Sequence, residues 1–314
     1  MKRFDTFKFI PEEFANSAVA IGNFDGIHLG HKKVFSITRE IAQKEGIPSA
    51  ILTFEPHPRQ YFSPDSPPFR LVTSETRANL IEACGFDALF EIQFDKHLSN
   101  LTSEEFITQV LLEGLKVSHV VVGEDFRYGK KRQGDTEQLV LMGSSLGFEV
   151  TVLPKHSNSN LTYSSSTVRT ALKEGNLQVA RDCLDRWHSV EGVVKKGQKN
   201  GRSIGFPTAN LDFDGVVIPK FGVYSVFVDI LSGQYRGNYL GASSIGTKPT
   251  FGNFNTNLET YIFDFKGDIY GEHISISLVH YLRPEIKFDS IDALVTQMKS
   301  DCQKSREYLA GASR

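Results

Sequence analysis

The chain has 314 residues, of which 40% are hydrophobic and 23% are charged, and its formal net charge is -2. This composition is that of an ordinary globular protein, and the length favours two domains that each bury their own core. The balanced charge excludes binding to nucleic acid through a broad basic surface, so we expect no nucleic-acid partner.

The first half of the chain alternates short apolar strands with amphipathic helices. Strands are predicted at residues 18–22, 50–54, 88–92, 119–123 and 149–153. A helix is predicted over residues 29–44 and ends at Gly46, while Thr102 and Glu105 form the pattern of a capping box. Asp135 and Gly147 have the positions expected for the start and end of another helix. This alternation predicts an N-terminal α/β Rossmann-like domain with a parallel sheet.

After about residue 184 the pattern changes to glycine-rich, period-two strands. Residues 222–231 and 274–278 alternate apolar with polar side chains, and Ser232-Gly233 is a turn signal. A helix is predicted over residues 290–309, with Ile291 at the start of its apolar stripe. We therefore predict a C-terminal antiparallel β-barrel that ends in a helix, with domains at residues 1–184 and 185–314.

Cysteine usage and apolar runs bear on the cellular compartment. Cys84, Cys183 and Cys302 are far apart in the sequence, and none lies in a CxxC pattern. A disulfide framework and a cysteine zinc site are therefore not expected, and a reducing compartment is. The sequence contains no signal-peptide pattern and no apolar run of the about 18 residues that span a bilayer. We predict a cytoplasmic protein with no membrane partner, and the oligomeric state stays open.

Residues 22–31, GNFDGIHLGH, join the first predicted strand to the first predicted helix. A helix N-terminus offers unpaired N–H groups and partial positive charge, so anions bind there. Gly26 and Gly30 allow close approach of a phosphate, and His28 and His31 lie three residues apart at the helix start. Because imidazoles donate hydrogen bonds to phosphate oxygens, we predict a nucleotide site. The alternatives are two surface histidines, or a zinc site for which the pattern offers no third ligand.

Two later segments fit the same pocket, because loops at the carboxyl ends of strands bind ligands in open α/β sheets. Residues 120–135 read VVVGEDFRYGKKRQGD, a strand followed by a basic loop with Gly123, Gly129, Gly134, Arg127, Lys130, Lys131 and Arg132. Residues 163–169 read YSSSTVR and begin a helix, where the hydroxyls either cap the helix or bind phosphate. Arg169 could pair with a phosphate in bidentate fashion. Taken alone, the basic loop could equally be a solvated surface loop.

The second half contains residues 197–210, GQKNGRSIGFPTAN, which match neither a P-loop nor a kinase glycine loop. Thr208 offers a hydroxyl and Asn210 an amide oxygen, and hard oxygen ligands suit Mg²⁺ that bridges ATP phosphates. The alternative is a loop of turn-forming residues in which Asn210 is a local cap. Glu259 lies in the strand-like segment 258–265, where a carboxylate that faces ATP could take a proton from an attacking hydroxyl. A solvent-facing glutamate on a strand is the simpler alternative.

These strings, in this order, resemble the family of bacterial bifunctional riboflavin kinase/FAD synthetases over roughly residues 14 to 309. GNFDGIHLGH, VVGEDFRYGKKRQGD and SSSTVR are similar to the motifs of its adenylyltransferase module. GRSIGFPTANL, FGVYSV, SIGTKPTF, ETYIFDF, DIYGE and LRPEIKF are similar to its riboflavin kinase module. The resemblance implies phosphorylation of riboflavin to FMN by ATP, then adenylylation of FMN by a second ATP to FAD and pyrophosphate. Mg²⁺ would serve both steps.

The resemblance also implies roles for individual residues. In the N-terminal half, the ATP site would contain Gly22, Asn23, Phe24, His28, Gly30, His31, Ser164, Ser165 and Arg169, and Asp125 would help hold the flavin. In the C-terminal half, Gly197, Gly201 and Pro207 would shape the nucleotide loop, and Thr208 and Asn210 would bind ATP-Mg²⁺. Glu259 would be the catalytic base, and Arg283 would contact the flavin. The chain departs from the family at Tyr128, where Phe is usual, at Tyr163, where an aliphatic residue is usual, and at Asp185, where Gly is frequent.

Three other functions compete with the bifunctional enzyme. Only the kinase half could be active, since Tyr128 and Tyr163 both lie in the first half. A cytidylyltransferase shares the HxGH helix start but leaves the second half unexplained. A flavin-binding regulatory protein would keep the pockets, yet it would not need a base such as Glu259.

Overall fold

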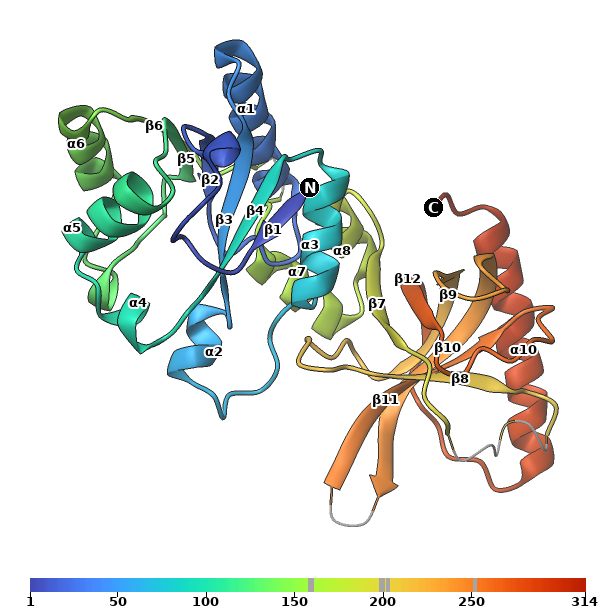
Figure 1. Ribbon diagram of the computed structural model, residues 1–314. Helices are drawn as coiled ribbons and strands as arrows, with labels where there is room; N and C mark the ends of the chain where they lie inside the picture. Colours follow the sequence, from blue (N-terminus) through green and yellow to red (C-terminus); the bar gives the residue numbers. More distant parts are fainter. Residues whose placement is uncertain (158–160, 198–200, 202–203, 251–252) are drawn as a thin grey trace. The chain divides into compact units, whose positions relative to one another are not determined.

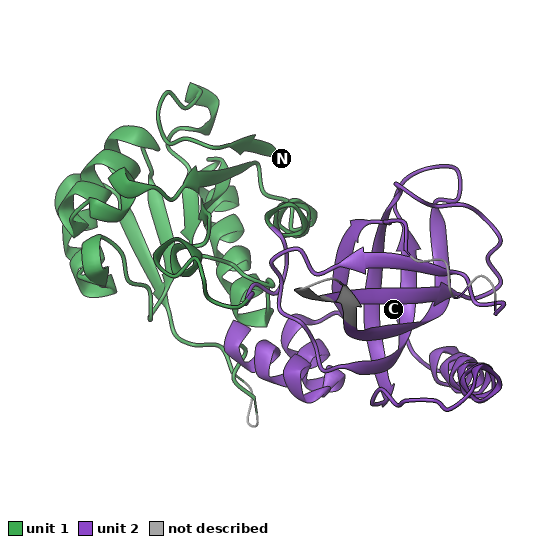
Figure 2. Cartoon of the chain, turned by 90° about the horizontal axis from the view of Figure 1, so that it is seen from below, with its two compact units in different colours: residues 1–67, 74–164 green, residues 68–73, 165–314 purple. Residues whose placement is uncertain are grey.

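The computed structural model describes residues 1–157, 161–197, 201, 204–250 and 253–314, without the side chains of residues 248–250 and 253–255. The chain forms two compact units, shown in Figures 1 and 2. The first unit comprises residues 1–67 and 74–164, and the second comprises residues 68–73 and 165–314. Five positions of the predicted C-terminal nucleotide loop, residues 198–200, 202 and 203, lie outside the described residues.

The first unit is built on a parallel sheet of six strands in the order β1-β4-β3-β2-β5-β6. These strands are β1 (Lys2–Phe4), β2 (Ala18–Ile21), β3 (Ser49–Glu55), β4 (Ala88–Gln93), β5 (His119–Gly123) and β6 (Glu149–Leu153). The five predicted strands are confirmed. The short edge strand β1 was not predicted, because three residues carry too little periodicity.

Helices cover both faces of this sheet, as Figure 1 shows. They are α1 (Leu29–Glu45), α2 (Pro58–Phe62), α3 (Ser74–Ala83), α4 (Lys96–Asn100), α5 (Ser103–Glu105), the π-helix η2 (Phe106–Gly114) and α6 (Thr136–Leu146), with short 3₁₀ turns η1 (Glu12–Phe14) and η3 (Lys130–Arg132). Alternate strand residues face opposite sides, so Ala20 packs with Val34 and Ile81 while Val19 and Ile21 pack with Ile107 and Leu139. Burial on both faces confirms the α/β prediction.

The predicted helix boundaries are confirmed by their caps. Gly46 and Gly147 adopt left-handed backbone with φ of 68° and 88° at the ends of α1 and α6. The Asp135 side chain accepts the N–H of Gln138 at the start of α6. At the start of α5, Thr102 Oγ1 accepts the N–H of Glu105 at 3.1 Å, and the Glu105 carboxylate accepts the N–H of Thr102 at 2.8 Å.

The second unit contains an antiparallel sheet of six strands in the order β7-β12-β9-β10-β11-β8. They are β7 (His188–Val193), β8 (Thr208–Asp212), β9 (Gly222–Ile230), β10 (Gly237–Thr250), β11 (Asn253–Ile262) and β12 (His273–Arg283). Just after β7, the N–H of Lys195 donates to the carbonyl of Asn210 at 2.9 Å. This bridge joins the two outer strands and curls the sheet, which confirms the barrel-like prediction.

Among the described residues, the helices of the second unit are α7 (Ser165–Glu174), α8 (Leu177–Leu184) and the C-terminal α10 (Ile291–Ala310). Asp185 ends α8 in left-handed backbone with φ of 57°, which explains why glycine suits this position. Ile291 is 66% exposed, so the apolar stripe predicted for α10 is wrong at its start. The side chains that α10 buries are those of Asp301, Ser305 and Leu309. Because the division between compact units precedes α7, the predicted boundary at residues 184 and 185 stays a prediction.

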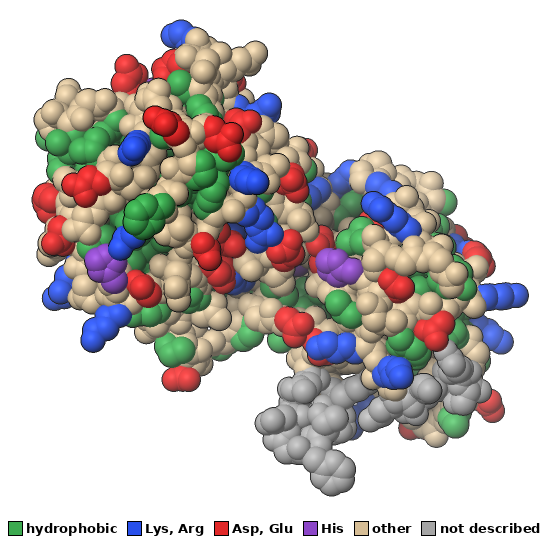
Figure 3. Space-filling view, in the orientation of Figure 1, with side chains coloured by type: hydrophobic (Ala, Val, Ile, Leu, Met, Phe, Trp, Pro, Cys, Tyr) green, Lys and Arg blue, Asp and Glu red, His purple; other side chains and the backbone are tan. Residues whose placement is uncertain are grey.

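The surface carries both signs of charge. Lysine and arginine side chains are interspersed with aspartate and glutamate on the face drawn in Figure 3. None of the helices in the described part of the chain has an apolar stretch sufficient to cross a membrane.

Replacing Thr102 by Ala should lower the free energy of unfolding of the first unit by about 1 kcal/mol, because the N–H of Glu105 loses its acceptor. Urea denaturation, followed by a probe in the first unit, measures this change. The control is Glu105→Gln, which keeps an acceptor for the Thr102 N–H and should cost less than Thr102→Ala. Equal losses in the two variants would contradict the capping-box account.

Candidate functional site

The connection between β2 and α1 forms a tight turn at the carboxyl edge of the first sheet. Phe24, Gly26 and Ile27 have positive φ values of 47°, 81° and 47°. The N–H of Gly22 donates to the carbonyl of Leu52 at 3.1 Å, which continues the sheet into the turn. The Phe24 ring lies so close to Gly22 that an added Cβ would meet it at 2.9 Å. Glycine at position 22 is therefore required by close approach of the aromatic ring.

His28 and His31 lie together at the start of α1. Their rings stack with centroids 3.6 Å apart and planes 26° apart, and Phe24 packs edge-on against His31. His28 is the N-cap, and its Nδ1 accepts the N–H of His31 at 3.4 Å. A Cβ on Gly30 would meet the His28 ring at 3.0 Å and the Tyr163 carbonyl at 3.2 Å. The structure therefore brings Gly22, Phe24, His28, Gly30 and His31 together, as the sequence predicts.

The protonation of this pair follows from its surroundings. Since Nδ1 of His28 accepts a hydrogen bond, the proton of a neutral His28 ring is on Nε2, which is then a donor. Burial, and then the charge of His28, lower the pKa of His31 well below 6.5, so that ring is neutral at pH 7. Nδ1 of His31 is buried and has no hydrogen-bond partner in the described part of the chain. An anion at the helix start would meet imidazole N–H donors without an extra fixed positive charge.

Arg77 holds the turn in place, and no motif in the sequence indicates it. This side chain on α3 is fully buried. Its Nη1 donates to the carbonyl of Asn23 at 3.1 Å, and its Nη2 pairs with Glu55 at 3.0 Å and Glu91 at 2.5 Å. Thr53 Oγ1 also lies 3.4 Å from the Asn23 carbonyl. The contacts join residues far apart in the sequence, so periodicity and spacing carry no signal for them.

The loop after β5 places Asp125 at the same sheet edge, since β5 runs parallel to β2. The Asp125 carboxylate is 72% exposed and lies 3.8 Å from Nζ of Lys155. Tyr128 is buried against Phe126 and donates its hydroxyl to Oε1 of Gln138 at 3.2 Å. The Tyr128 hydroxyl, which a Phe at this position would lack, is therefore accommodated in the core of the first unit.

The third predicted segment is divided between the two units. Ser164 ends the first unit, next to Tyr163, whose carbonyl faces Gly30. Ser165 and Arg169 lie on α7 in the second unit. There, Nε of Arg169 donates to the carbonyl of Phe69 at 2.6 Å, and the guanidinium lies 5.4 Å from the Phe69 ring centroid. The structure therefore gives Arg169 a contact with residues 68–73 that the sequence does not indicate.

In the second unit, one face of the β8/β11 pair gathers the predicted kinase residues. Asn210 is directly opposite Glu259, and Thr208 is opposite Tyr261. Ala209 and Leu211 point into the core, so Thr208 and Asn210 point to the other face. Nδ2 of Asn210 donates to the Thr208 carbonyl at 3.2 Å, and Nδ2 of Asn257 donates to Oε1 of Glu259 at 3.0 Å. Two oxygen-bearing side chains and one oriented carboxylate thus share this face.

The glycines of the loop before β8 lie against the same group. A Cβ on Gly197 would meet Nδ2 of Asn210 at 2.7 Å, and a Cβ on Gly201 would meet the Phe206 carbonyl at 2.2 Å. The N–H of Phe206 donates to the carbonyl of Gly201 at 2.8 Å, so this turn closes on itself ahead of the exposed Pro207. The close approaches explain the glycines at both positions.

Arg283 lies elsewhere in the second sheet. On β12, Arg283 is paired with Val223 of β9, and Val223 is paired with Ser244 of β10. Ser244 in turn is paired with Glu259 of β11. Three strand spacings of about 4.8 Å separate Arg283 from Glu259 along the sheet. Its guanidinium pairs with the buried Asp301 at 2.7 Å and donates to the Pro284 carbonyl at 2.9 Å. The ion pair with Asp301 fastens α10 to β12, and a flavin contact at Arg283 stays a prediction.

Comparison with known proteins assigns the two halves of the chain to two family models. A family model described as FAD synthetase matches residues 10–167, and one described as riboflavin kinase matches residues 184–309. The chain is 35% identical over 301 residues to a bifunctional riboflavin kinase/FMN adenylyltransferase of Buchnera aphidicola, covering 95% of each protein. It is 35% identical over 290 residues to the Escherichia coli K12 protein of the same name, covering 92% of each.

A solved structure is similar over nearly the whole chain. It is described as a macrolide-efflux protein from Streptococcus pneumoniae, has 30% sequence identity, and aligns with a TM-score of 0.85 over 99% of each chain.

The stacked histidines make a testable prediction about proton binding. In the intact protein, the His31 ring should stay neutral as the pH falls through 6.5, because burial and His28 both lower its pKa. His28→Gln should raise the pKa of His31 while leaving it below 6.5, since burial is the larger cause and remains. NMR titration of the histidine Cε1–H signals measures this. His273→Gln, on β12 in the second unit, is the control and should leave the His31 signal unchanged. A His31 signal that titrates near 6.5 in the intact protein would refute the burial account.

Proposed function

The chain belongs to the family of bifunctional riboflavin kinase/FMN adenylyltransferases, and we propose that its two activities use the two groups of residues described above. It is an enzyme that phosphorylates riboflavin with ATP to give FMN, and joins FMN to AMP from ATP to give FAD and pyrophosphate. One observation carries the assignment of sites. The His28–His31 pair falls within the FAD synthetase match, and Thr208, Asn210 and Glu259 fall within the riboflavin kinase match.

In the kinase reaction, the terminal ribityl hydroxyl of riboflavin attacks the γ-phosphorus of ATP, and the bond from that phosphorus to the β-bridging oxygen breaks to release ADP. Glu259 takes the proton of the attacking hydroxyl. Its carboxylate is oriented by Asn257 and lies across from Asn210. Phosphoryl transfer depends mostly on positioning and charge stabilisation, so this base contributes without dominating.

The residues opposite Glu259 fit a divalent cation. Thr208 supplies a hydroxyl oxygen and Asn210 an amide oxygen, and the hydrogen bond from Nδ2 of Asn210 to the Thr208 carbonyl fixes the amide plane. Hard oxygen donors of this kind are what Mg²⁺ prefers, so we assign Mg²⁺ to Thr208 and Asn210. When bound, it neutralises the negative charge of the ATP phosphates.

In the adenylyltransferase reaction, a phosphate oxygen of FMN attacks the α-phosphorus of ATP, and pyrophosphate leaves directly without a covalent enzyme intermediate. Nε2–H of His28 donates to the phosphate that gains charge, and His31 supplies a second neutral imidazole. Gly22, Asn23, Phe24 and Gly30 line the ATP site. Ser164, Ser165 and Arg169 are assigned to its phosphates, and Asp125 to the flavin.

We assign the adenylyltransferase domain to residues 1–184 and the kinase domain to residues 185–314. The comparisons do not favour a chain with only one active half or a flavin-binding regulator, since both family models match. Macrolide efflux is named only for the Streptococcus pneumoniae structure, and the proposed function follows the family models. The dispersed cysteines support a reducing compartment, the cytoplasm, as the place of both reactions.

Two variants test the division of labour. Glu259→Gln should slow FMN formation from riboflavin by about 100-fold or more and leave FMN-to-FAD conversion intact. His28→Ala combined with His31→Ala should slow FAD formation by about 100-fold and leave riboflavin phosphorylation intact. Chromatographic separation of riboflavin, FMN and FAD measures both reactions. If either variant were well folded and lost both activities, the two sites would not be independent.

Two glycine variants provide a steric test in which each serves as the control of the other. The methyl of Gly30→Ala would displace the His28 ring, and that of Gly197→Ala would displace the Asn210 amide. Displacement of a catalytic or binding group costs about 10- to 100-fold in rate. Gly30→Ala should therefore slow only FAD formation, and Gly197→Ala only FMN formation. If each variant slowed the reaction assigned to the other site, the assignment of sites would be reversed.

A further inference from the structure

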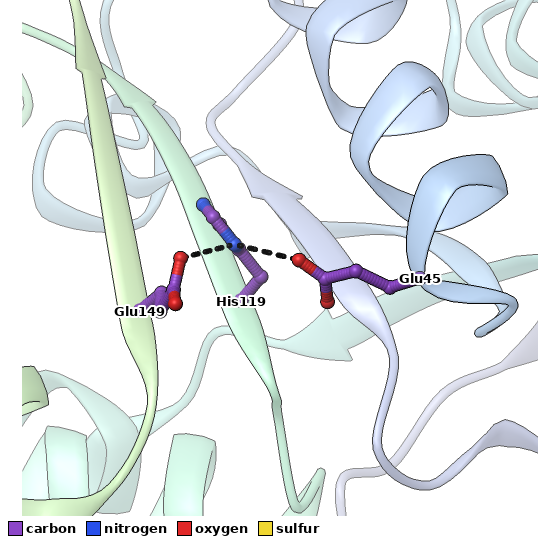
Figure 4. Close-up of side chains that lie close together, drawn as sticks. All are labelled: Glu45, His119 and Glu149. Carbon is purple, nitrogen blue, oxygen red and sulfur yellow. Dashed lines mark ion pairs between the residues drawn. The ribbon is translucent and has the colours of Figure 1, made fainter.

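Three side chains with metal-binding atoms meet at the amino edge of the first sheet, at the opposite edge from the β2–α1 turn. They are Glu45, His119 and Glu149, shown in Figure 4. Nδ1 of His119 lies 3.5 Å from a carboxylate oxygen of Glu149 and 3.9 Å from one of Glu45. The three atoms all lie within 4.8 Å of one another. The carboxylates reach solvent, with exposed fractions of 37% for Glu45 and 79% for Glu149, while His119 is 5% exposed.

The fold brings Glu45, His119 and Glu149 together. His119 begins β5 and Glu149 begins β6, and the two residues are direct partners in the parallel register. Glu45 is the last residue of α1, which returns the chain to the same edge. The His28–His31 pair lies at the other end of α1, and 17 residues of helix at about 1.5 Å each place it roughly 25 Å away. The cluster is therefore separate from the nucleotide turn.

The buried imidazole directs its Nδ1 atom into the cluster. In the described part of the chain, Nδ1 of His119 has no hydrogen-bond partner. Nε2 lies 2.8 Å from the Thr151 hydroxyl. If Nε2 donates to this hydroxyl, the lone pair on Nδ1 faces two carboxylates. Metal-binding histidines have this arrangement, because a partner on the second nitrogen fixes the tautomer and the ring orientation.

The negative charges at this edge of the sheet favour the binding of a cation. Glu45 places a negative charge at the C-terminus of α1, where the helix carbonyls already concentrate partial negative charge. Glu149 adds a second negative charge on the other side of the imidazole. We propose that Glu45, His119 and Glu149 form a binding site for a divalent cation of the Zn²⁺ class, which ties the end of α1 to β5 and β6.

The ligand set selects the cation. One imidazole and two carboxylates suit Zn²⁺, whereas Ca²⁺ and Mg²⁺ favour oxygen ligands alone. Tetrahedral zinc, with bonds of about 2.0–2.1 Å, sets its ligand atoms roughly 3.3 Å apart. The separations of 3.5 and 3.9 Å between His119 Nδ1 and the two carboxylates need a small closure, and the glutamate oxygens, within 4.8 Å of each other, come closer by rotation of their exposed side chains. Water from the solvent side would complete the coordination. This inference is independent of the proposed function.

Zinc titration of the full chain, stripped of metal by a chelator and free of nucleotide, tests the proposal. Calorimetry and elemental analysis of the desalted protein should find one Zn²⁺ at this site. Glu149→Gln should weaken this binding by at least about tenfold, and Thr151→Val by about 10- to 100-fold. The matched control Glu113→Gln, which removes an exposed carboxylate from the same unit, should bind zinc like the unaltered chain. Zinc should also raise the thermal unfolding midpoint of the first unit, and less so in Glu149→Gln.

The paired imidazoles at the nucleotide turn could also attract zinc, so the titration is repeated with His28 and His31 both replaced by Ala. Retention of the Glu149-sensitive binding in that variant supports the proposal. X-ray absorption should then find nitrogen and oxygen neighbours. Equal zinc binding by Glu149→Gln and the unaltered chain, sulfur neighbours of the metal, or no binding at all would each overturn it.

Discussion

The turn between β2 and α1 depends on one buried cation. The Arg77 guanidinium binds the Asn23 carbonyl and two carboxylates, at the end of β3 and on β4, and so fastens three adjacent segments at the carboxyl edge of the sheet. Breaking a buried ion pair by removing one partner costs about 3–5 kcal/mol, because a charge is left buried and uncompensated. The turn must hold positive φ at positions 24, 26 and 27, and this network keeps it there. The orientation of the His28 and His31 side chains therefore depends on the Arg77 contacts.

In the second unit, the alternation of side chains along the strands positions the proposed site residues. Because successive side chains point to opposite faces, burying Ala209 and Leu211 necessarily presents Thr208 and Asn210 together. The antiparallel register then sets Glu259 beside Asn210 from a segment much further along the chain. The proposed acid–base group and the proposed cation ligands thus come from two regular strands, whose hydrogen-bond ladders make the arrangement rigid.

Local signals were sufficient for five strands of the first sheet, for the helix caps and for the site turns, but not for the three-residue edge strand β1. The β2–α1 turn was predictable because Gly26, His28 and Gly30 are close together in the sequence. Arg77, His119 and Asp301 were not, because their partners lie far away in the sequence and spacing carries no trace of such contacts. The stripe of α10 was mispredicted at Ile291 for a related reason. That helix buries Asp301 against Arg283 and Ser305 against Ser225, polar pairs that a hydrophobic pattern cannot anticipate.

The SSSTVR segment belongs to both compact units, with Ser164 in the first and Ser165 and Arg169 in the second. Helix α7 is secured to the second unit by the Arg169–Phe69 contact and by the hydrogen bond from the Lys220 N–H to the Leu172 carbonyl. A gene split before α7 would remove Ser165 and Arg169, the proposed phosphate-binding residues, from the synthetase half, and one after α8 would remove α7 and α8 from the second unit. With the proposed role for this segment, the division gives a physical reason for the two enzymes to persist as a single polypeptide.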